Sequence, residues 1–218
     1  MLESRKKEES FYKKGKTVLI KIKDLTKVYG EKKIYNKFSM EIKEECITAL
    51  LAESGGGKTT LLRIVAGLEN YQEGTIEGLL GKKIAFVFQE DRLLPWLTVE
   101  QNIAFVLKGC LTEDEIAYKT EDWLKKLQLE EAKHEYPKSL SGGMRRRVAL
   151  ARAFCYPYDL LLLDEPFKGL QRQLKKDILT HLLEQQKKNP KTILWSAHDE
   201  EEVKGYVQEI KRIKKGTL

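Results

Sequence analysis

Residues 46–66 of this chain read CITALLAESGGGKTTLLRIVA, and this stretch decides the fold. It predicts an apolar strand, then a glycine-rich turn, then an amphipathic helix, which is the context that a phosphate-binding loop requires. Glycines let the backbone curl so that several N–H groups converge on one anion, and the helix that follows adds the positive end of its dipole. Lys58 can then reach the phosphates of a nucleotide, and the hydroxyl of Thr59 can hold Mg²⁺. The predicted loop comprises Ala52, Glu53, Ser54, Gly55, Gly56, Gly57, Lys58, Thr59 and Thr60.

A flexible glycine turn followed by a chance Lys-Thr pair is the alternative. It is disfavoured because strand, turn, Lys-Thr and helix all agree. One departure is visible at Ala52, which stands where the first glycine of the pattern usually sits. Alanine is the smallest replacement, so the loop is expected to survive, and it would suffer only if position 52 required a positive φ.

Length and composition indicate a globular protein with ample chain to bury a core. The 218 residues suggest one large domain or a core with a small subdomain, and 41% hydrophobic and 33% charged residues fit a soluble chain. No apolar run approaches the length of a membrane span. The three cysteines are scattered without metal-ligand spacing and are interpreted as free thiols of a reducing cytosol: Cys46, Cys110 and Cys155.

The net charge of +7 comes with lysines concentrated at both ends of the chain. A nucleic-acid or anionic-membrane footprint is one interpretation. A solvated surface is favoured, because acidic residues interleave with the lysines and no base-stacking aromatic motif accompanies them. Residues 1–16 are therefore predicted to be a flexible basic arm, and no nucleic-acid partner is expected.

Strands are predicted on both sides of the phosphate loop. Apolar residues alternate over 18–22, and a second strand is predicted around 34–42, so that two antiparallel strands would form a small β-layer. Residues 75–76 and 84–88 are further strand candidates. Tyr29 precedes a turn and could stack on an adenine ring, while a packing role is equally open from spacing alone.

A helical segment is predicted in the middle of the chain. Thr98 with Gln101 has the pattern of a capping box, and residues 113–129 carry an apolar face at helical spacing. Residues 98–138 would thus form a helical insertion. Its apolar side chains are interpreted either as ordinary core or as a docking surface for a partner.

Two carboxylates follow a continuous apolar strand at residues 160–163. Such a run suits a central strand that is buried on both faces, and ligands gather at the carboxyl ends of strands in open α/β sheets. Asp164 is therefore predicted to lie near the phosphate loop and hold Mg²⁺, and Glu165 to orient or deprotonate an attacking water. A capped strand end is the alternative, which is weakened by Lys58 and Thr59 in the same chain.

Two further polar residues, Gln89 and His198, each follow a predicted strand. His198 could donate a hydrogen bond to a γ-phosphate, and a purely structural role is equally open from its position. His134 and His181 lack such a context and are expected at the surface.

A second glycine-containing helix start lies at residues 140–143. A helix that opens in this way, here predicted to run to about residue 154, is a potential anion site, although such a start is most often only a helix cap. The potential site residues are Ser141, Gly142 and Gly143. The three arginines that follow are expected to form a solvated helix face: Arg145, Arg146 and Arg147.

Together these motifs resemble the ATP-binding subunit of an ABC transporter, over almost the whole chain from about residue 18. The most specific element is Leu140-Ser141-Gly142-Gly143, which is similar to the ABC signature and precedes the strand that ends in Asp164-Glu165. Three single residues follow the family's order: Tyr29 of the A-loop, Gln89 of the Q-loop and His198 of the H-loop. Residues 89–99 resemble importers of the nitrate, sulfonate and taurine type.

The resemblance implies an α/β fold with a P-loop NTPase core. This core has a mostly parallel sheet, a small N-terminal antiparallel β-layer and an α-helical subdomain at about residues 90–155, all within a single ABC ATPase domain over 17–218. The implied ligands are ATP and Mg²⁺, with the metal held by Thr59, Gln89 and Asp164. The implied catalytic residues are Lys58, Gln89, Glu165 and His198. In the implied head-to-tail dimer, the signature of a second copy closes over the γ-phosphate through Ser141, Gly142 and Gly143.

The function that the resemblance implies is ATP hydrolysis that powers an importer of a small solute, such as an organic anion, sulfonate, nitrate or vitamin precursor. The implied partners are integral membrane permease subunits and an extracytoplasmic solute-binding protein. The implied location is the cytoplasmic face of the cell membrane, as a peripheral subunit. ABC ATPases of DNA repair would need coiled-coil arms, and those of translation two cassettes, and this sequence carries neither.

Two departures from the family pattern concern the chain's mechanism. Gln171 stands where the family usually has the D-loop aspartate that touches the other subunit, and Arg146 stands where related transporters commonly have glutamine. Loss of the charge at 171 would weaken communication between two ATP sites. Together with Ala52, it keeps open an alternative, an ATP-gated clamp or regulatory subunit with weak hydrolysis.

Overall fold

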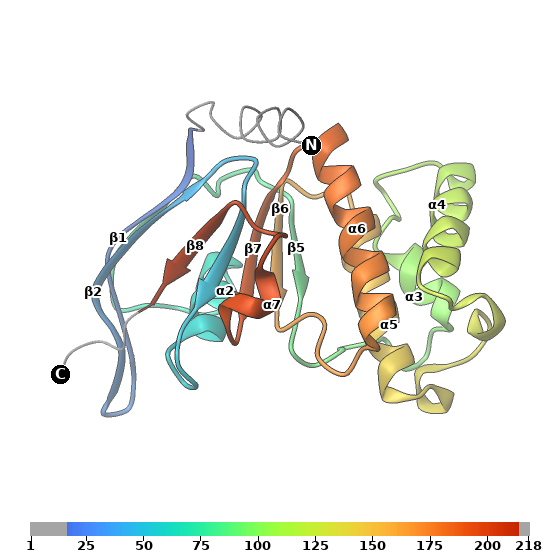
Figure 1. Ribbon diagram of the computed structural model, residues 1–218, viewed down its shortest axis with the longest axis horizontal. Coiled ribbons are helices and arrows are strands. Elements are labelled where there is room, and N and C mark those ends of the chain that lie inside the picture. The colour runs from blue at the N-terminus through green and yellow to red at the C-terminus, as the bar shows by residue number, and fades with distance from the viewer. Residues whose placement is uncertain (1–16, 214–218) are drawn as a thin grey trace, which may run out of the picture.

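The structure of the chain is a computed structural model that describes residues 17–213 (Figure 1). A small sheet lies at one side of the molecule, a larger sheet stands at its centre, and the helices from the middle of the chain gather at the other side. The predicted basic arm at residues 1–16 lies outside the described residues.

The larger sheet has five strands in the order β5-β6-β7-β3-β8, and every pairing within it is parallel. Its strands are β3 (Ile47–Leu51), β5 (Ile84–Val87), β6 (Leu160–Asp164), β7 (Thr192–Ala197) and β8 (Glu209–Arg212). β3, β6 and β7 are buried along their whole length, as expected for strands covered on both faces. The register sets Leu51 beside Ala197 and Asp164 beside Ser196, so these strands end at one edge of the sheet.

The smaller sheet is antiparallel and has three strands in the order β2-β1-β4. They are β1 (Val18–Tyr29), β2 (Lys32–Lys43) and β4 (Glu73–Glu77). The two antiparallel strands predicted before the phosphate loop are confirmed as β1 and β2, and β4 adds a third from beyond the loop. β1 pairs along both of its edges, and Ile22 lies opposite Met40 of β2 and Ile76 of β4.

Within the described residues, the α-helices are α2 (Lys58–Val65), α3 (Val99–Phe105), α4 (Glu113–Lys126), α5 (Gly142–Cys155), α6 (Arg172–Lys188) and α7 (Glu200–Val203). Two short 3-10 turns, η1 (Glu130–Ala132) and η2 (Pro137–Ser139), connect α4 to α5. α3 and α4 both begin with complete capping boxes, so the box predicted at Thr98 and Gln101 is confirmed. α4 ends at Lys126 rather than at 129, because Gln128 takes a positive φ of 53°. None of the helices within 17–213 is long and apolar enough to cross a membrane.

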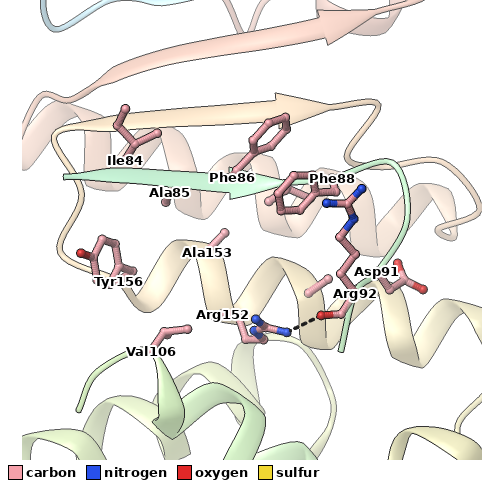
Figure 2. Close-up of a pocket in the computed structure, with 12 residues that line it drawn as sticks. Ile84, Ala85, Phe86, Phe88, Asp91, Arg92, Val106, Arg152, Ala153 and Tyr156 are labelled. Atoms are coloured by element: carbon pink, nitrogen blue, oxygen red, sulfur yellow. Dashed lines mark hydrogen bonds between the residues drawn. The ribbon is translucent and has the colours of Figure 1, made fainter. Parts of the chain in front are cut away.

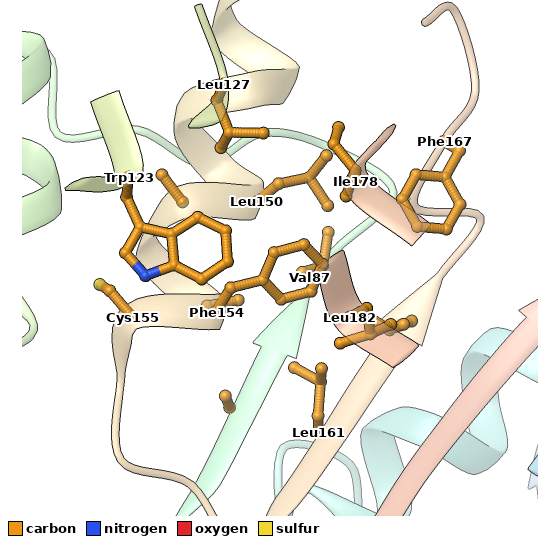
Figure 3. Close-up of a cluster of buried hydrophobic side chains, with 14 of the residues drawn as sticks. Val87, Trp123, Leu127, Leu150, Phe154, Cys155, Leu161, Phe167, Ile178 and Leu182 are labelled. Carbon is orange, nitrogen blue, oxygen red and sulfur yellow. The ribbon is translucent and has the colours of Figure 1, made fainter. Parts of the chain in front are cut away.

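Two buried clusters cover the two faces of the larger sheet. Because successive residues of a strand point to opposite faces, Leu160 and Leu162 of β6 join one cluster and Leu161 and Leu163 join the other. The first cluster includes α2 and the smaller sheet. The second includes α5, α6 and the α3–α4 segment, and Figure 3 shows part of it around Trp123. α2 and α5 therefore cover opposite faces of the larger sheet.

A buried asparagine fixes the segment between β5 and α3. The side chain of Asn102, on α3, accepts a hydrogen bond from the N–H of Leu94 at 2.9 Å and donates to the carbonyl oxygens of Leu94 and Leu97 at 3.1 and 3.0 Å. It ties the irregular stretch before α3 to the helix, and that stretch continues from the end of β5, where Gln89 lies.

Asn102→Ala is expected to lower the free energy of unfolding by about 1–3 kcal/mol, because the backbone groups that the carboxamide bonds would lose their partner. Urea denaturation measures the loss. Asn36→Ala, at an exposed position of β2, is the matched control and is expected to change stability little. Equal stability of the Asn102 variant and the wild type would show that this side chain does not hold the segment.

Candidate functional site

The phosphate loop is built on a left-handed glycine that packs against a buried tyrosine. Gly57 is the N-cap of α2 with a φ of 91°, a conformation that glycine adopts without a steric penalty. The Tyr35 hydroxyl, from β2, donates to the carbonyl oxygen of Gly57 at 2.8 Å, and a Cβ at position 57 would lie 2.6 Å from that hydroxyl oxygen. Burial raises the pKa of Tyr35, which keeps its hydroxyl a neutral donor. Position 57 therefore requires glycine, and the smaller sheet holds the loop in place.

Ala52 fits the loop because Gly56 has no side chain. The backbone of Ala52 does not take a positive φ, so the condition under which an alanine would strain the loop is not met. A Cβ on Gly56, in contrast, would lie 2.8 Å from the Cβ of Ala52 and 2.9 Å from the carbonyl oxygen of Glu53. The loop thus has room for one methyl group between these two positions. Ala52 supplies that group, so position 56 must be glycine.

Lys58 extends back along the loop. Its side chain is buried, and Nζ donates to the carbonyl oxygen of Ala52 at 2.8 Å. An ammonium group has three N–H donors, so others remain for an anion at the mouth of the loop. A buried cation at the first turn of a helix, behind a glycine-rich loop, suits the phosphates of a nucleotide.

The carboxyl ends of β6 and β7 bring two carboxylates and a serine together. Asp164 is buried, and its Oδ1 accepts a hydrogen bond from the Ser196 hydroxyl at 2.7 Å. The oxygen of that hydroxyl accepts in turn from the backbone N–H of Glu165 at 3.1 Å. Ser196 therefore fixes both acidic residues. It is absent from the sequence-based site, although a buried hydroxyl inside an apolar strand was an available signal.

Two of the predicted catalytic side chains, Gln89 and His198, lie against a third, Glu165. Its φ of 46° is left-handed, a conformation that costs a non-glycine residue on the order of 1–3 kcal/mol. Its Oε1 lies 3.0 Å from Nε2 of His198, and its Oε2 accepts a hydrogen bond from Nε2 of Gln89 at 3.4 Å. Lys168 adds an ammonium 3.7 Å from Oε2. The structure thus brings Gln89, Glu165 and His198 into one group, directly after Asp164.

Oxygen donors of the kind that Mg²⁺ prefers are present, although no acidic cage is. Within residues 17–213, no group of three or more His, Cys, Asp or Glu side chains is arranged to hold a metal ion. Mg²⁺ does not require one, since it is usually bound by one or two carboxylates, water and substrate phosphates. Thr59, Gln89 and Asp164 offer a hydroxyl, an amide oxygen and a carboxylate, so these residues fit that ion.

Tyr29 ends β1 with 43% of its surface exposed. The buried ammonium of Lys27 lies 4.3 Å from the centroid of its ring and 2.6 Å from Oε1 of Glu69. The hydrogen bond from Lys27 holds the pKa of Glu69 below its ordinary value. A cation on the ring accounts for a packing role, and the exposed remainder of the ring leaves the stacking role open.

The serine-glycine cap begins α5, on the face of the sheet opposite to α2. Ser141 is the N-cap, and its hydroxyl oxygen accepts from the backbone N–H of Met144 at 3.2 Å. Gly142 is exposed, and a Cβ on Gly143 would meet nothing within 4 Å. The cap is open to a ligand, but it does not share the sheet face on which α2 carries Lys58.

The prediction of a solvated arginine face on α5 is wrong. Arg146 is only 4% exposed, and Arg145 and Arg147 donate to backbone carbonyl oxygens. Helical spacing is the signal that identifies Arg146, because its position lies four residues before Leu150, on the buried side of the helix. Burial lowers the pKa of Arg146, and the nearby carboxylate of Asp91 opposes that shift.

The surface position predicted for His181 is also wrong, whereas that of His134 is confirmed. His181 is half-buried, with its ring edge-on to Trp123 at a centroid distance of 5.3 Å, and desolvation lowers its pKa. His134 is exposed, and its Nδ1 lies 3.0 Å from Oε1 of Glu100.

A cavity of about 300 Å³ lies between β5 and α5, beside the segment that carries Gln89 (Figure 2). Its walls are largely apolar and also include Arg92 and Arg152. The Arg92 guanidinium lies 4.1 Å from the centroid of the Phe88 ring, and Nη1 of Arg152 donates to the carbonyl oxygen of Arg92 at 2.9 Å. This cavity lies along β5, the outermost strand on one side of the larger sheet. Gln89, Glu165 and His198 are not among the residues that line it.

Comparison with known proteins finds similarity over most of the chain. Residues 35–168 match the family described as "ABC transporter". The chain is 38% identical over 209 residues to the "Probable sulfate/thiosulfate import ATP-binding protein CysA" of Chlorella vulgaris. The match covers 91% of this chain and 89% of that protein. It is 38% identical over 189 residues to the "Aliphatic sulfonates import ATP-binding protein SsuB" of Bacillus cereus, with 83% and 73% covered. It is 37% identical over 212 residues to the "Fe(3+) ions import ATP-binding protein FbpC" of Fusobacterium nucleatum, of whose length it spans only 57%.

A solved structure with the same fold is described as a dimeric post-hydrolysis state of the ATP-binding cassette MJ0796 bound to ADP and Pi. It has a TM-score of 0.80 and 28% sequence identity, and the match covers 90% of this chain and 95% of that one. A second, described as the dimeric structure of the same bacterial ABC transporter cassette, has a TM-score of 0.80 and 29% identity.

Gly56→Ala is expected to weaken ATP binding roughly tenfold or more, because overpacking by one methyl group costs about 1–3 kcal/mol. The new Cβ would displace the loop N–H groups that are expected to bind phosphate. Titration with a fluorescent ATP analogue measures the affinity.

Ala52→Gly supplies the matched control for the Gly56 substitution. On its own it is expected to keep the affinity, and combined with Gly56→Ala it is expected to restore part of the loss, because one of the two close contacts disappears. Wild-type affinity in the single Gly56→Ala variant would contradict this account of the loop.

Proposed function

We propose that this chain, which belongs to the ABC transporter family, is the ATP-hydrolysing subunit that powers a membrane importer of a small solute. Membership of the family makes it an ABC-type ATP-binding domain and an ATPase.

The observation that carries the proposal is the convergence of Gln89, Glu165 and His198 at the strand ends that border the lysine loop. β3 leads into the loop of Lys58 and β6 leads into Glu165, and both strands pair with β7, which His198 follows. One edge of the sheet therefore carries the ammonium group of Lys58, the carboxylate of Glu165 and the imidazole of His198. This combination suits phosphoryl transfer to water.

In the proposed reaction, Lys58 and the N–H groups of the loop bind the phosphates of ATP and fix their position. Glu165 orients the attacking water and accepts its proton, and His198 donates a hydrogen bond to the γ-phosphate. Thr59, Gln89 and Asp164 would hold Mg²⁺, which when bound would supply positive charge to neutralise the phosphates. Catalysis is then mainly positioning and charge neutralisation, with little covalent chemistry for the protein to perform.

The other half of each ATP site is proposed to come from a second copy of the chain. Ser141, Gly142 and Gly143 begin α5 on the sheet face away from α2, which suits them to a nucleotide held by another copy. A head-to-tail pair then has two identical composite sites. The dimeric state described for a similar ABC cassette supports this arrangement. ATP binds the closed pair more tightly than the open one and so favours closure, and hydrolysis reopens the pair.

The proposed partners are integral membrane permease subunits and an extracytoplasmic solute-binding protein, with this chain at the cytoplasmic face of the cell membrane as a peripheral subunit. Support comes from relatives that are named as import ATP-binding proteins. Their named solutes differ, so the proposed cargo is a class: an organic anion, sulfonate, nitrate, vitamin precursor or similar small solute. Trp96 and Phe105, both exposed on the helical side, would help to pass movement from the Gln89 segment to the permease.

The alternative function is an ATP-gated clamp or regulatory subunit with weak hydrolysis. Two departures from the family pattern favoured this alternative. Ala52 no longer supports it, because its backbone does not take a positive φ, so Gln171 is the departure that still does. Gln171 is exposed at the N-cap of α6 and makes no side-chain capping bond, so it provides neither the charge nor the cap that an aspartate would.

Glu165→Gln is expected to lower the ATPase rate about 10²- to 10⁴-fold while ATP binding persists, because the amide keeps the shape of the side chain and loses the base. Phosphate release, measured on the purified protein and again with its permease, tests this. Glu131→Gln, at an exposed position of η1, is the control and should hydrolyse ATP like the wild type. Wild-type turnover in the Glu165 variant would remove that residue from the mechanism.

Gln171→Asp is expected to raise the stability of α6 by about 0.5–2 kcal/mol through an N-cap hydrogen bond, and to change the ATPase rate little. Thermal unfolding and phosphate release measure the two effects. A wild-type rate near zero that rises steeply in this variant would favour the clamp with weak hydrolysis.

A further inference from the structure

The guanidinium of Arg146 binds three successive carbonyl oxygens of the loop that carries Glu165. Nε donates to the carbonyl oxygen of Pro166 at 2.7 Å, and Nη2 donates to those of Glu165 and Asp164 at 2.8 and 3.2 Å. A planar fork with five N–H donors can hold several peptide planes in a fixed relation at once.

The same guanidinium also holds the loop that carries Gln89. Nη1 donates to the carbonyl oxygen of Phe88 and, at 3.5 Å, to that of Gln89. Asp91, from the same loop, places its Oδ1 3.5 Å from Nη1 and balances the charge. One side chain of α5 therefore joins the segment after β5 to the segment after β6.

The backbone that Arg146 binds is strained at the residue that matters for hydrolysis. Glu165 has a φ of 46°, which a residue with a side chain keeps only where its surroundings impose it. Its own carbonyl oxygen and those on either side of it all accept from Arg146. The carboxylate of Glu165, only 13% exposed, then meets the Gln89 amide and His198 in the geometry described above.

A buried charge is an expensive way to fill space in a protein. Neutral side chains of similar volume are often as stable or more stable in such a place, so burial of a guanidinium calls for another reason. Glutamine, the residue that resemblance to related transporters leads us to expect at 146, has two N–H donors in place of five. Its two donors could not serve the five carbonyl oxygens of the two loops that the guanidinium binds.

We propose that Arg146 is a positioning residue, whose guanidinium fork locks the loops of Gln89 and Glu165 to each other and so sets the geometry for attack on ATP. This inference rests on the proposed ATPase function and concerns the same site. It requires the fork and not only the positive charge. The guanidinium of Arg146 is buried and is bound to backbone carbonyl oxygens and Asp91, so ATP affinity is expected not to depend on it.

Arg146→Lys tests the inference directly, because it keeps the charge and removes the fork. The kcat for ATP hydrolysis is expected to fall roughly ten- to a hundredfold while KM stays unchanged, since displacement of a catalytic group by about 1 Å can cost that much. Arg147→Lys is the matched control. Arg147 donates to the carbonyl oxygens of Leu127 and Gln128, at the end of α4, and its substitution should leave kcat unchanged.

Hydrogen exchange gives a second readout that does not depend on turnover. Faster exchange at residues 88–91 and 164–168 is expected in Arg146→Lys and not in Arg147→Lys. Arg146→Gln removes the buried charge, so it should fold even if the lysine variant does not, and it should show the same loss of kcat at unchanged KM.

Three results would overturn the inference. They are a wild-type kcat in both Arg146 variants, an equal loss of kcat in the Arg147 control, or unchanged exchange in the two loops. A wild-type protein that binds and hydrolyses no ATP would instead overturn the proposed function and the catalytic part of this inference. Exchange would still decide whether Arg146 locks the loops.

Discussion

The parallel register of β6 with β7 is the constraint on which the site depends. It sets Asp164 beside Ser196, and from that pairing one hydroxyl fixes both Asp164 and the backbone of Glu165. β3 joins the same register and delivers the loop of Lys58 to the same edge. A shift of one residue in any of these strands would turn every side chain to the other face and separate the two loops. Every residue of β3, β6 and β7 is buried, so that shift would be costly.

Two left-handed residues in this frame shape the chemistry, and each is held by a neighbour outside its own loop. Gly57 turns the chain into α2, and the hydroxyl of Tyr35 from the smaller sheet binds its carbonyl oxygen. Glu165 turns the chain away from β6, and Arg146 from α5 binds its carbonyl oxygen. Each layer that covers the central sheet thus contributes one polar side chain that fixes the backbone of a loop. The two layers therefore fix the geometry of the site in addition to burying the core.

The sequence predicts the parts of this site that are local, and misses those that depend on contacts between distant segments. The phosphate loop and Asp164-Glu165 follow from short patterns, since strand, glycine turn and strand end are written within a few residues. The addition of β4 to the smaller sheet and the half-burial of His181 depend on tertiary pairing, which periodicity does not specify. Ser196 and Arg146 are polar residues on buried faces, where hydrophobic patterns predict no function. Their roles become visible only when their partners are placed.

The measurement that tests the account most directly is titration of the intact, folded chain with ATP and Mg²⁺. Calorimetry measures the binding, and light scattering measures the mass of the complex. The account predicts saturable binding of one ATP per chain, and a complex with the mass of two chains when hydrolysis is blocked. Circular dichroism on the same sample verifies that the protein is folded. A folded protein that binds no nucleotide at all would contradict it.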